Sequence, residues 1–551
     1  MHNKAETWDV IVVGGGSAGC VLANRLSADP SVKVLVLEAG PMDWRWDFRL
    51  HMPAALTWPL ASRRYNWWYE SEPEPGMGGR RIYQPRGKVL GGSSSINGMI
   101  WIRGNPLDYE RWGQQPGLES WDFAHCLPYF RRLEHRLEGA DAYHGNDGPL
   151  RLTTPACEGP LFEAFFAAVK QAGYPVTEAV NGYQQEGFSP FDRTTDRGRR
   201  RSAARAYYHP VKSRPNLTLR CRALTTRILF EGRRAVGVEY RRGRQVHRVY
   251  ADQILCCGGA INSPQLLQLS GVGPADRLKE LDIPVVQDLP GVGEGLQDHL
   301  EVYVQYASTQ PVSLYPALAW WRAPWIGAQW LFGRRGIGAS NHFEAGGFIR
   351  TNDEVAIPNV QFHFLPIAIR YDGSAPNEGH GYQVHVGPTL SDARGWVRLR
   401  STDPTVYPEI RFNYLSTAQD RREWVEAIRC TRDILGQPAF DALRGAELAP
   451  GEAVQTDAEI LDFIARQGES AYHPSCTCRM GTDPQAVTDP ELRVHGLEGL
   501  RVVDASVMPS ITNGNIYAPV LMIAEKAADL IRGETPLPAQ NLPFYRHEGS
   551  A

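Results

Sequence analysis

Three glycines and one acid near the start of the chain have the types and spacing that dinucleotide binding requires. Gly14, Gly16 and Gly19 form a G-x-G-x-x-G pattern, and Glu38 follows one helix and one strand later. Gly14 permits a tight turn, Gly16 lets a pyrophosphate approach the backbone, and Gly19 lets a helix pack closely on a strand. Glu38 is placed to accept hydrogen bonds from ribose hydroxyls. The alternative interpretation is a tight turn in an ordinary α/β unit.

The elements that must position these residues are readable on either side of the turn. An apolar, β-branched run over 9–13 predicts a strand, and residues 20–26 have the apolar spacing of a helix. A second strand over 33–37 ends on Glu38. The helix would begin at the glycine turn, so its N-terminus would face the phosphate charge.

Length and composition limit the kinds of protein this can be. The chain has 551 residues, too many for one compact core, so we expect two closely packed domains. Its composition, 42% hydrophobic and 22% charged, is that of a soluble globular protein. A net charge of −3 argues against a nucleic-acid partner. We interpret the basic run 197–201 as a solvated loop rather than a phosphate-binding patch.

The cysteines and the N-terminus bear on the compartment. Nine cysteines at irregular spacing, with Cys476-x-Cys478 wrongly spaced for zinc, predict free thiols in a reducing compartment and no metal site. Because the glycine pattern begins so early, we expect no secretory signal. The sequence therefore predicts a cytoplasmic protein.

The most apolar stretch, 315–332, is broken by Pro316, Arg322 and Pro324, so no membrane span is expected there. It contains four tryptophans, at 320, 321, 325 and 330. Three interpretations stay open: contact with the inner face of a membrane, contact with a partner in a homo-oligomer, or packing as core or lid.

Four further motifs identify a family. They are 87–98 (GKVLGGSSSING), 259–273 (GAINSPQLLQLSGVG), 472–481 (YHPSCTCRMG) and 503–509 (VDASVMP). In this order they resemble the glucose–methanol–choline (GMC) oxidoreductases, which are FAD enzymes, and the likeness runs from residue 8 to about 533. Within that family, stretches at 52–56, 65–67, 311–318, 338–348 and 363–366 are similar to bacterial choline dehydrogenases of glycine-betaine synthesis.

Strand–helix alternation and a middle region of longer alternating strands give the expected fold class. It is α/β, with a discontinuous, Rossmann-like FAD-binding domain and a substrate-binding domain with a largely antiparallel sheet. We assign 8–155, 210–305 and 470–533 to the first domain and 156–209 and 306–469 to the second. The proline-rich tail, 534–551, is expected to be loosely held.

The resemblance implies a set of FAD-binding residues: Gly14, Gly16, Ser17, Ala18, Gly19, Glu38, Ala39, Arg86, Gly91, Gly92, Ser93, Asn97, Gly98, Met99, Ile100, Ala223, Asp504, Ala505 and Asn515. Ile96 stands where some choline oxidases carry a histidine bonded to FAD. Isoleucine cannot form that bond, so we expect noncovalent FAD.

Two residues match the catalytic positions of the family. His473 matches the catalytic histidine, and imidazole has the pKa best suited to proton transfer near neutrality. Asn515 matches the second position, where a neutral amide can hydrogen-bond the alcohol oxygen without competing as a base. A core histidine bonded to a carbonyl is the alternative for His473.

A choline head group needs opposite charge and aromatic faces, because a trimethylammonium has no N–H to donate. Glu301 resembles the choline-binding carboxylate, and a structural ion pair near the flavin is its alternative. Trp58, Phe343 and Tyr472 fall at or near the aromatic positions, Trp58 only through a one-residue gap. His363 matches another active-site histidine.

The resemblance thus implies oxidation of choline to betaine aldehyde, and chemically on to betaine, with a respiratory quinone or O₂ as electron acceptor. Cys476, in place of a usual glycine, can shift His473. Tyr517, in place of a common asparagine, puts the substrate size in question. A GMC enzyme for another primary alcohol, or an FAD-binding lyase without redox chemistry, are therefore the rival hypotheses.

Overall fold

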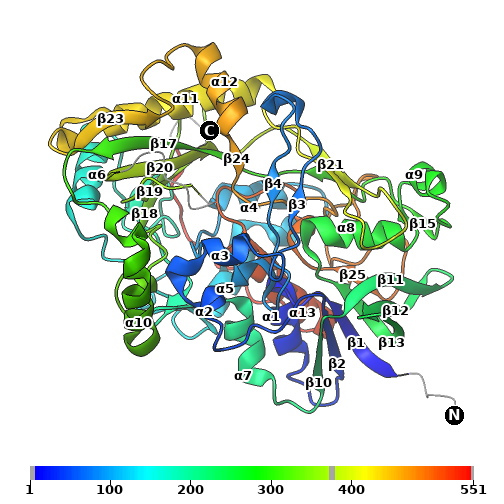
Figure 1. The fold of residues 1–551 in the computed structure, drawn as a ribbon. Coiled ribbons are helices and arrows are strands. Elements are labelled where there is room, and N and C mark those ends of the chain that lie inside the picture. Colours follow the sequence, from blue (N-terminus) through cyan, green and yellow to red (C-terminus); the bar gives the residue numbers. More distant parts are fainter. Residues whose placement is uncertain (1–5, 371–378, 548–551) are drawn as a thin grey trace.

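The computed structural model describes residues 6–370 and 379–547, and its first sheet carries the glycine turn (Figure 1). The strand order is β10-β2-β1-β13-β12-β11, with β25 also paired to β13. β1, β2, β10, β13 and β25 pair in parallel, whereas β11, β12 and β13 pair antiparallel. The bounds are β1 (Thr7–Val13), β2 (Val34–Glu38), β10 (Leu217–Cys221), β11 (Leu224–Glu231), β12 (Arg234–Arg242), β13 (Gln245–Cys256) and β25 (Leu500–Val502).

Two helices from opposite ends of the chain cover this sheet together. α1 (Ser17–Leu26) begins at the glycine turn, and α13 (Tyr517–Arg532) packs against it. The buried carboxylate of Glu525 on α13 binds Arg25 of α1 at 2.8 Å and Arg132 at 2.9 Å. These ion pairs join the end of the chain to its beginning, so both termini of the sequence contribute to one domain.

The second sheet is antiparallel throughout. Its order is β23-β17-β20-β19-β18-β7, with β24 also paired to β17. The bounds are β7 (Gly187–Pro190), β17 (Leu300–Ser308), β18 (Ala345–Ile349), β19 (Val360–Leu365), β20 (Gly381–Pro388), β23 (Arg444–Ala449) and β24 (Glu469–Ser470). One parallel-based and one antiparallel sheet confirm the predicted fold class.

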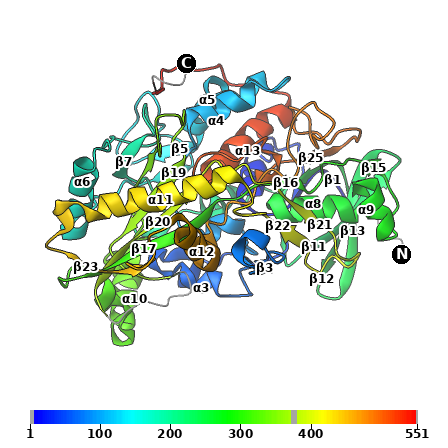
Figure 2. The ribbon, with the colours of Figure 1, turned by 90° about the horizontal axis from the view of Figure 1, so that it is seen from above.

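Helices α6 (Pro160–Gln171) and α11 (Ala418–Gly436) cover one face of the second sheet, and Figure 2 shows α11 lying across it. Phe165 of α6 stacks on Phe364 of β19 with ring centroids 4.3 Å apart. α12 (Asp457–Gln467) packs on α11 in turn. The opposite face of the sheet is therefore the one that meets the first domain.

The remaining elements lie outside the two large sheets and the helices named so far. The helices are α2 (Phe48–His51), α3 (Thr57–Leu60), α4 (Pro106–Gly113), α5 (Phe123–Leu133), α7 (His209–Val211), α8 (Gly259–Leu269), α9 (Ala275–Glu280) and α10 (Ala323–Gly333). The strands are β3 (Tyr69–Glu70), β4 (Tyr83–Gln84), β5 (Glu134–Arg136), β6 (Leu150–Leu152), β8 (Thr195–Asp196), β9 (Arg199–Arg200), β14 (Val272–Gly273), β15 (Gln287–Asp288), β16 (Glu294–Leu296), β21 (Gly395–Arg398) and β22 (Glu409–Arg411).

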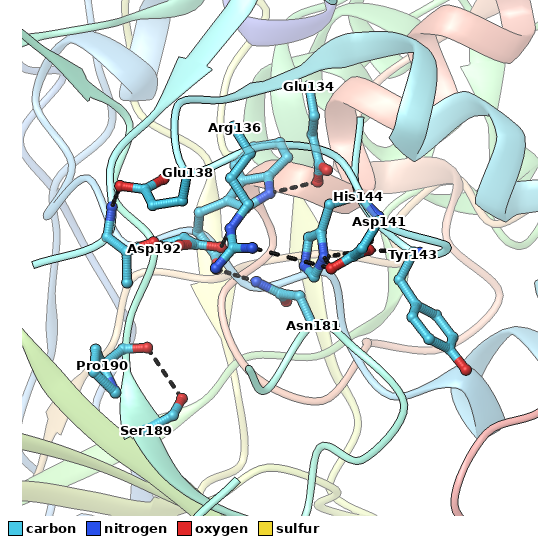
Figure 3. A network of polar contacts seen from close by, with 12 residues as sticks. Glu134, Arg136, Glu138, Asp141, Tyr143, His144, Asn181, Ser189, Pro190 and Asp192 are labelled. Carbon is cyan, nitrogen blue, oxygen red and sulfur yellow. Dashed lines mark hydrogen bonds and ion pairs between the residues drawn. The ribbon is translucent and has the colours of Figure 1, made fainter. Parts of the chain in front are cut away.

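A buried polar network surrounds β5 (Figure 3). Glu134 accepts a hydrogen bond from Trp101 Nε1 at 2.8 Å and forms an ion pair with Arg103. Asn181 Nδ2 donates to Trp101 O at 2.9 Å. The Trp101 ring then meets the ring of Tyr517 edge-on, with centroids 5.7 Å apart. The network therefore holds Tyr517 at the start of α13.

The described part of the tail, 534–547, has no helix or strand, yet it lies against α5. Phe544 packs edge-on against Phe123 at 5.4 Å, and Gln540 N donates to Ala124 O at 2.8 Å.

The segment 156–209, assigned to the substrate-binding domain, contacts the layers of both sheets. Its strand β7 joins the antiparallel sheet, whereas residues 204–208 pack on α1. The domain boundaries themselves stay predictions.

All nine cysteines lie in the described part of the chain and are free thiols. Among the described helices, none combines the length and the apolar character needed to cross a bilayer.

Candidate active site

One cavity runs from the glycine turn after β1 to the inner face of the antiparallel sheet, and it collects most of the predicted site. Of the residues assigned to FAD, the alcohol or catalysis, those lining it are Gly14, Gly16, Ser17, Ala18, Glu38, Ala39, Arg86, Gly92, Ser93, Asn97, Gly98, Met99, Ile100, Ala223, Glu301, Phe343, His363, Tyr472, His473, Asp504, Ala505 and Asn515. Gly19, Gly91 and Trp58 are the three that do not line it.

The glycine turn leaves a cradle that a pyrophosphate would fill. Gly14 has φ +106°, and a Cβ there would lie 2.5 Å from Cys257 O. A Cβ on Gly16 would meet nothing closer than 3.8 Å, because it would project into the cavity. Gly92, from the second glycine motif, packs so closely that a Cβ on it would lie 2.8 Å from Gly16 Cα. The two glycine motifs thus line one side of a space that a pyrophosphate can enter, and this fits FAD.

The two acids of the cofactor region hold the backbone around this cradle. Glu38 accepts from Gly15 N at 2.9 Å and from Gly40 N at 2.7 Å, and burial raises its pKa to about 7. Asp504 accepts from Gly259 N at 2.8 Å, at the start of α8, and burial raises its pKa as well. Both carboxylates also face the cavity, where ribose and flavin hydroxyls would reach them.

The three predicted residues outside the cavity have other surroundings. A Cβ on Gly19 would lie 1.9 Å from Gly14 O, so Gly19 lets α1 close on the turn. Gly91 N donates to Gly15 O at 2.7 Å and supports the second motif from behind. Trp58 is 53% exposed and packs edge-on against Phe48 at 5.2 Å, on the outer surface.

A hydrogen-bond chain determines which nitrogen of His473 is free. His299 Nε2 lies 2.9 Å from Thr389 O, and a carbonyl only accepts, so His299 Nε2 carries the proton. His299 Nδ1 must then accept, and it lies 3.0 Å from His473 Nδ1. The proton of His473 is therefore on Nδ1. Its Nε2 keeps a lone pair that faces the cavity.

Asn515 meets that lone pair in a fixed orientation. Its Nδ2 lies 3.2 Å from His473 Nε2, and its Oδ1 accepts from Gln361 Nε2 at 3.1 Å. Because the carbonyl end is already bonded, the amide presents N–H groups to the cavity. A hydroxyl bound between His473 and Asn515 would meet one acceptor and one donor.

Burial keeps these imidazoles neutral. It lowers the pKa of His473 well below its usual 6.5, helped by the nearby charge of Arg86. It also lowers the pKa of His299 and of His363 to about 4. At neutral pH His473 is thus an unprotonated base in the free protein.

Asp298 places the loop that carries His473. Its Oδ1 accepts from His473 N at 2.6 Å, while its Oδ2 accepts from Gln84 at 2.9 Å, Tyr414 at 2.5 Å and Ser470. Four donors around one buried carboxylate fix the backbone at the base of the site.

Glu301 supplies a buried negative charge on the substrate side. It lies on β17, is 5% exposed, and its Oε1 is 3.3 Å from His385 Nδ1. The Phe343 ring meets the rings of His385 and His363 edge-on at 5.3 and 6.1 Å. The buried His363 Nε2 has no hydrogen-bond partner among the described residues, although it lines the cavity. This end of the cavity therefore combines one carboxylate with aromatic faces.

The three departures from the family pattern take distinct places. Cys476 adopts φ +74°, the conformation a glycine would favour, and donates to Gln297 Oε1 at 3.4 Å. The ring of Tyr517 meets that of Trp101 on the side of α1 and the 92–95 turn. Ile96 lines the cavity and is buried.

Several functional residues were missed by the sequence reasoning: Asp298, His299, Gln361 and His385. Asp298 and His299 lie three and two residues before Glu301, in the same short stretch, which is a usable signal. Gln361 lies two residues before His363 on β19, and alternate residues of a strand share a face. His385 pairs across β20 with His363, a register that only the sheet reveals.

Comparison with known proteins gives a consistent result. A family model described as GMC oxidoreductase matches residues 8–301, and a second model of that description matches 391–524. The chain is 56% identical over 552 aligned residues to an oxygen-dependent choline dehydrogenase of Staphylococcus aureus (strain JH9), covering 99% of this chain and 97% of that one. It superposes on a pyridoxine 4-oxidase from Mesorbium loti with TM-score 0.86, 35% identity and coverage of 96% and 100%. An FAD-dependent oxidoreductase from Chaetomium thermophilum gives TM-score 0.86 and 28% identity, with coverage of 96% and 99%.

Proposed function

The chain belongs to the GMC oxidoreductase family, an FAD-dependent family, and we propose that this protein oxidises choline to betaine aldehyde. The observation that carries the proposal is Glu301, a buried carboxylate placed among aromatic rings in the same cavity as the unprotonated Nε2 of His473. The 56% identity to an oxygen-dependent choline dehydrogenase supports the same substrate.

His473 takes the hydroxyl proton of the alcohol on Nε2. The proton already on Nδ1 stays bonded to His299, which orients the ring as it becomes a cation, and the new Nε2–H points to the alcohol oxygen, because Asn515 Nδ2 is itself a donor. Asn515 Nδ2 donates to the alcohol oxygen as negative charge develops on it. Bound FAD supplies the acceptor for the hydride that leaves the alcohol carbon.

Glu301 and the rings of Phe343 and Tyr472 hold the trimethylammonium group. A quaternary ammonium is bound by opposite charge and by ring faces, and both are present at this end of the cavity. With the head group held there, the length of the choline molecule places its alcohol oxygen beside His473.

The remaining features concern the substrate end of the cavity, the link to FAD and the electron acceptor. Tyr517 belongs to the flavin side of the cavity, so it leaves the substrate end open. We propose further that FAD is bound without a covalent link, since Ile96 has no nucleophile. O₂ or a respiratory quinone would reoxidise it, in the cytoplasm, where nine free thiols are stable.

Anaerobic reduction of the flavin by candidate alcohols tests the proposal directly. Choline is expected to bleach the flavin faster than its neutral isostere 3,3-dimethylbutanol or an aromatic alcohol at equal concentration. A preference for the neutral alcohol would favour another GMC substrate, and no bleaching by any alcohol would favour a lyase. Acid precipitation is expected to release yellow FAD into the supernatant, whereas colour retained in the pellet would contradict noncovalent binding.

A further inference from the structure

The exposed aromatic residues of this protein gather on one surface. In the described part of the chain, every exposed tryptophan lies within 44–58 or 318–332. We define the aromatic surface by the exposed large apolar residues of these segments: Trp44, Trp46, Phe48, Trp58, Leu318, Trp320, Trp321, Trp325, Leu331 and Phe332. Trp320 is 80% exposed and Phe332 is 87% exposed. Ordinary soluble surfaces rarely gather such side chains in one place.

The two segments are joined in space as well as by composition. Trp330, the one buried residue of α10, donates from Nε1 to Gly198 O at 2.7 Å. Arg199 next to it donates to Arg45 O at 3.1 Å. A Cβ on Gly338 would lie 3.1 Å from Met52 Cε, so the turn after α10 also abuts the first segment. Figure 1 places α10 on the same side of the molecule as α2 and α3.

α10 differs from an ordinary surface helix, because its apolar residues are not turned inward. Its sequence, APWIGAQWLFG, contains no charged residue, and only Trp330 is buried. An apolar helix of this kind normally lies in a core. Here Trp325, Leu331 and Phe332 face outward instead.

The charge around this surface has a single sign. Segments 44–68 and 314–343 contain seven arginines and one acid, Asp47, in a chain whose net charge is −3. Asp47 is buried and paired with Arg49. Arg45, Arg322 and Arg335 are exposed. Asp43 and Glu344, which directly flank the two segments, and Asp196, beside the contacting residues 198–199, are paired with Arg205, Arg193 and Arg151.

We propose that the aromatic surface docks the protein on an anionic phospholipid bilayer. Tryptophan and arginine together suit the headgroup region, where rings enter the acyl boundary and guanidinium groups meet phosphate. A second copy of the chain is a poorer occupant, because a symmetric contact would place arginines against arginines. Their exposure excludes a core position for the outward residues.

The same segments also reach the active-site cavity from their inner side. Leu56 and Leu60, beside Trp58, line the cavity, and Phe343 follows α10 into it. Docking would therefore bring the wall of the site close to the lipid headgroups. The proposal does not depend on the substrate being choline.

Vesicle flotation of the holoenzyme tests the proposal. The probes are vesicles of phosphatidylglycerol with phosphatidylethanolamine, and vesicles of pure phosphatidylcholine. We expect binding to the anionic vesicles that weakens as salt increases, and little binding to the neutral ones. No binding to anionic vesicles at low salt, or equal binding to both kinds, would overturn it.

Matched variants separate the aromatic and charge contributions. Replacing Trp320, Trp321, Trp325 and Phe332 by serine should reduce vesicle partitioning at least about a hundredfold, because their apolar area no longer leaves water. The pair Arg322→Gln and Arg335→Gln should reduce it roughly tenfold or more. The controls are Val246→Ser and the pair Arg242→Gln and Arg244→Gln, exposed on the β12–β13 hairpin.

All variants should keep the wild-type melting temperature and flavin reduction by alcohol, which shows that the fold is intact. Equal loss of binding in the hairpin controls would contradict a localised docking surface. Sedimentation velocity without lipid decides the alternative: a wild-type dimer that the serine variant converts to monomer would identify the surface as a self-association interface instead.

Discussion

The catalytic cluster lies in the cavity that the inner side of segments 44–68 and 314–343 helps to line, whereas the aromatic surface lies on their outer side, and the two regions follow opposite rules. In the cluster, Asp298 and His299, from the loop before β17, and Asn515, just before α13, bond His473 from two separate stretches of the chain. On the surface, Trp320 and Phe332 project into solvent. In the catalytic cluster, the hydrogen-bond partners of a side chain therefore decide its reactivity. On the aromatic surface, the proposed affinity for lipid comes from side chains that the fold leaves exposed.

The largest expected effect is the removal of the base itself. His473→Ala should lower the rate of anaerobic flavin reduction by roughly 10²–10⁴-fold, the usual contribution of a general base. FAD content should stay unchanged, since the cradle of Gly14 and Gly16 is separate. Stopped-flow absorbance with choline measures the rate. Near-wild-type reduction would show that another group takes the proton.

Removing the partner of the base should cost less than removing the base. In His299→Ala the Nδ1–H of His473 loses its acceptor, so the ring can adopt the tautomer that blocks Nε2. We expect the reduction rate to fall about ten- to a hundredfold and its pH dependence to shift. His495→Ala, a histidine bonded to Gly481 O outside the cavity, is the matched control. An unchanged pH profile in His299→Ala would show that His299 only packs against His473 and does not fix its tautomer.

Glu301→Gln keeps the shape of the side chain and removes its charge. Choline affinity should fall roughly ten- to a hundredfold, while 3,3-dimethylbutanol should bind nearly as before. The comparison of the two alcohols in anaerobic titrations isolates the charge. If both weaken equally, Glu301 serves the fold or the ion pair with His385 rather than the ammonium group.

The buried histidines should also make stability depend on pH. The pKa of His299 is about 4 in the folded protein and near 6.5 when unfolded, so the unfolded chain binds the extra proton as pH falls. His299 therefore lowers the free energy of unfolding progressively as the pH falls from 6.5 toward 4, by about 2 kcal/mol at pH 5. In urea unfolding, the free energy of unfolding of wild type should fall between pH 7 and 5 by about this amount more than that of His299→Gln. Equal losses would contradict a neutral, buried His299.

The smallest effect is expected at Cys476. The residue holds φ +74°, which costs about 1 kcal/mol for a non-glycine residue, but its buried thiol offsets this through packing. Cys476→Gly should therefore leave both the melting temperature and flavin reduction almost unchanged. His473 is placed by Asp298 rather than by residue 476, so a large rate change would show coupling along the loop.

Much of the fold could be predicted because local patterns carry it. The parallel strands β1 and β2 are continuous apolar runs, and the glycines between them permit only a tight turn. The β19 and β20 runs indicated the antiparallel sheet. The tail and Trp58 were harder, since their surroundings depend on which distant surfaces lie beside them: Phe544 meets Phe123, and Trp58 turns outward.

The sequence by itself determined the family and predicted the FAD-binding cradle and the base, because these reside in contiguous motifs whose residue types are tied to their chemistry. Only the tertiary structure decided which nitrogen of His473 is free, since that depends on Thr389 and His299, far from it in the chain. It alone turned Trp320 and Phe332 outward on a surface whose exposed charged residues Arg45, Arg322 and Arg335 are all basic. The physical reason is the same in both cases: protonation and exposure are properties of a residue's neighbours in space, and those neighbours are chosen by packing.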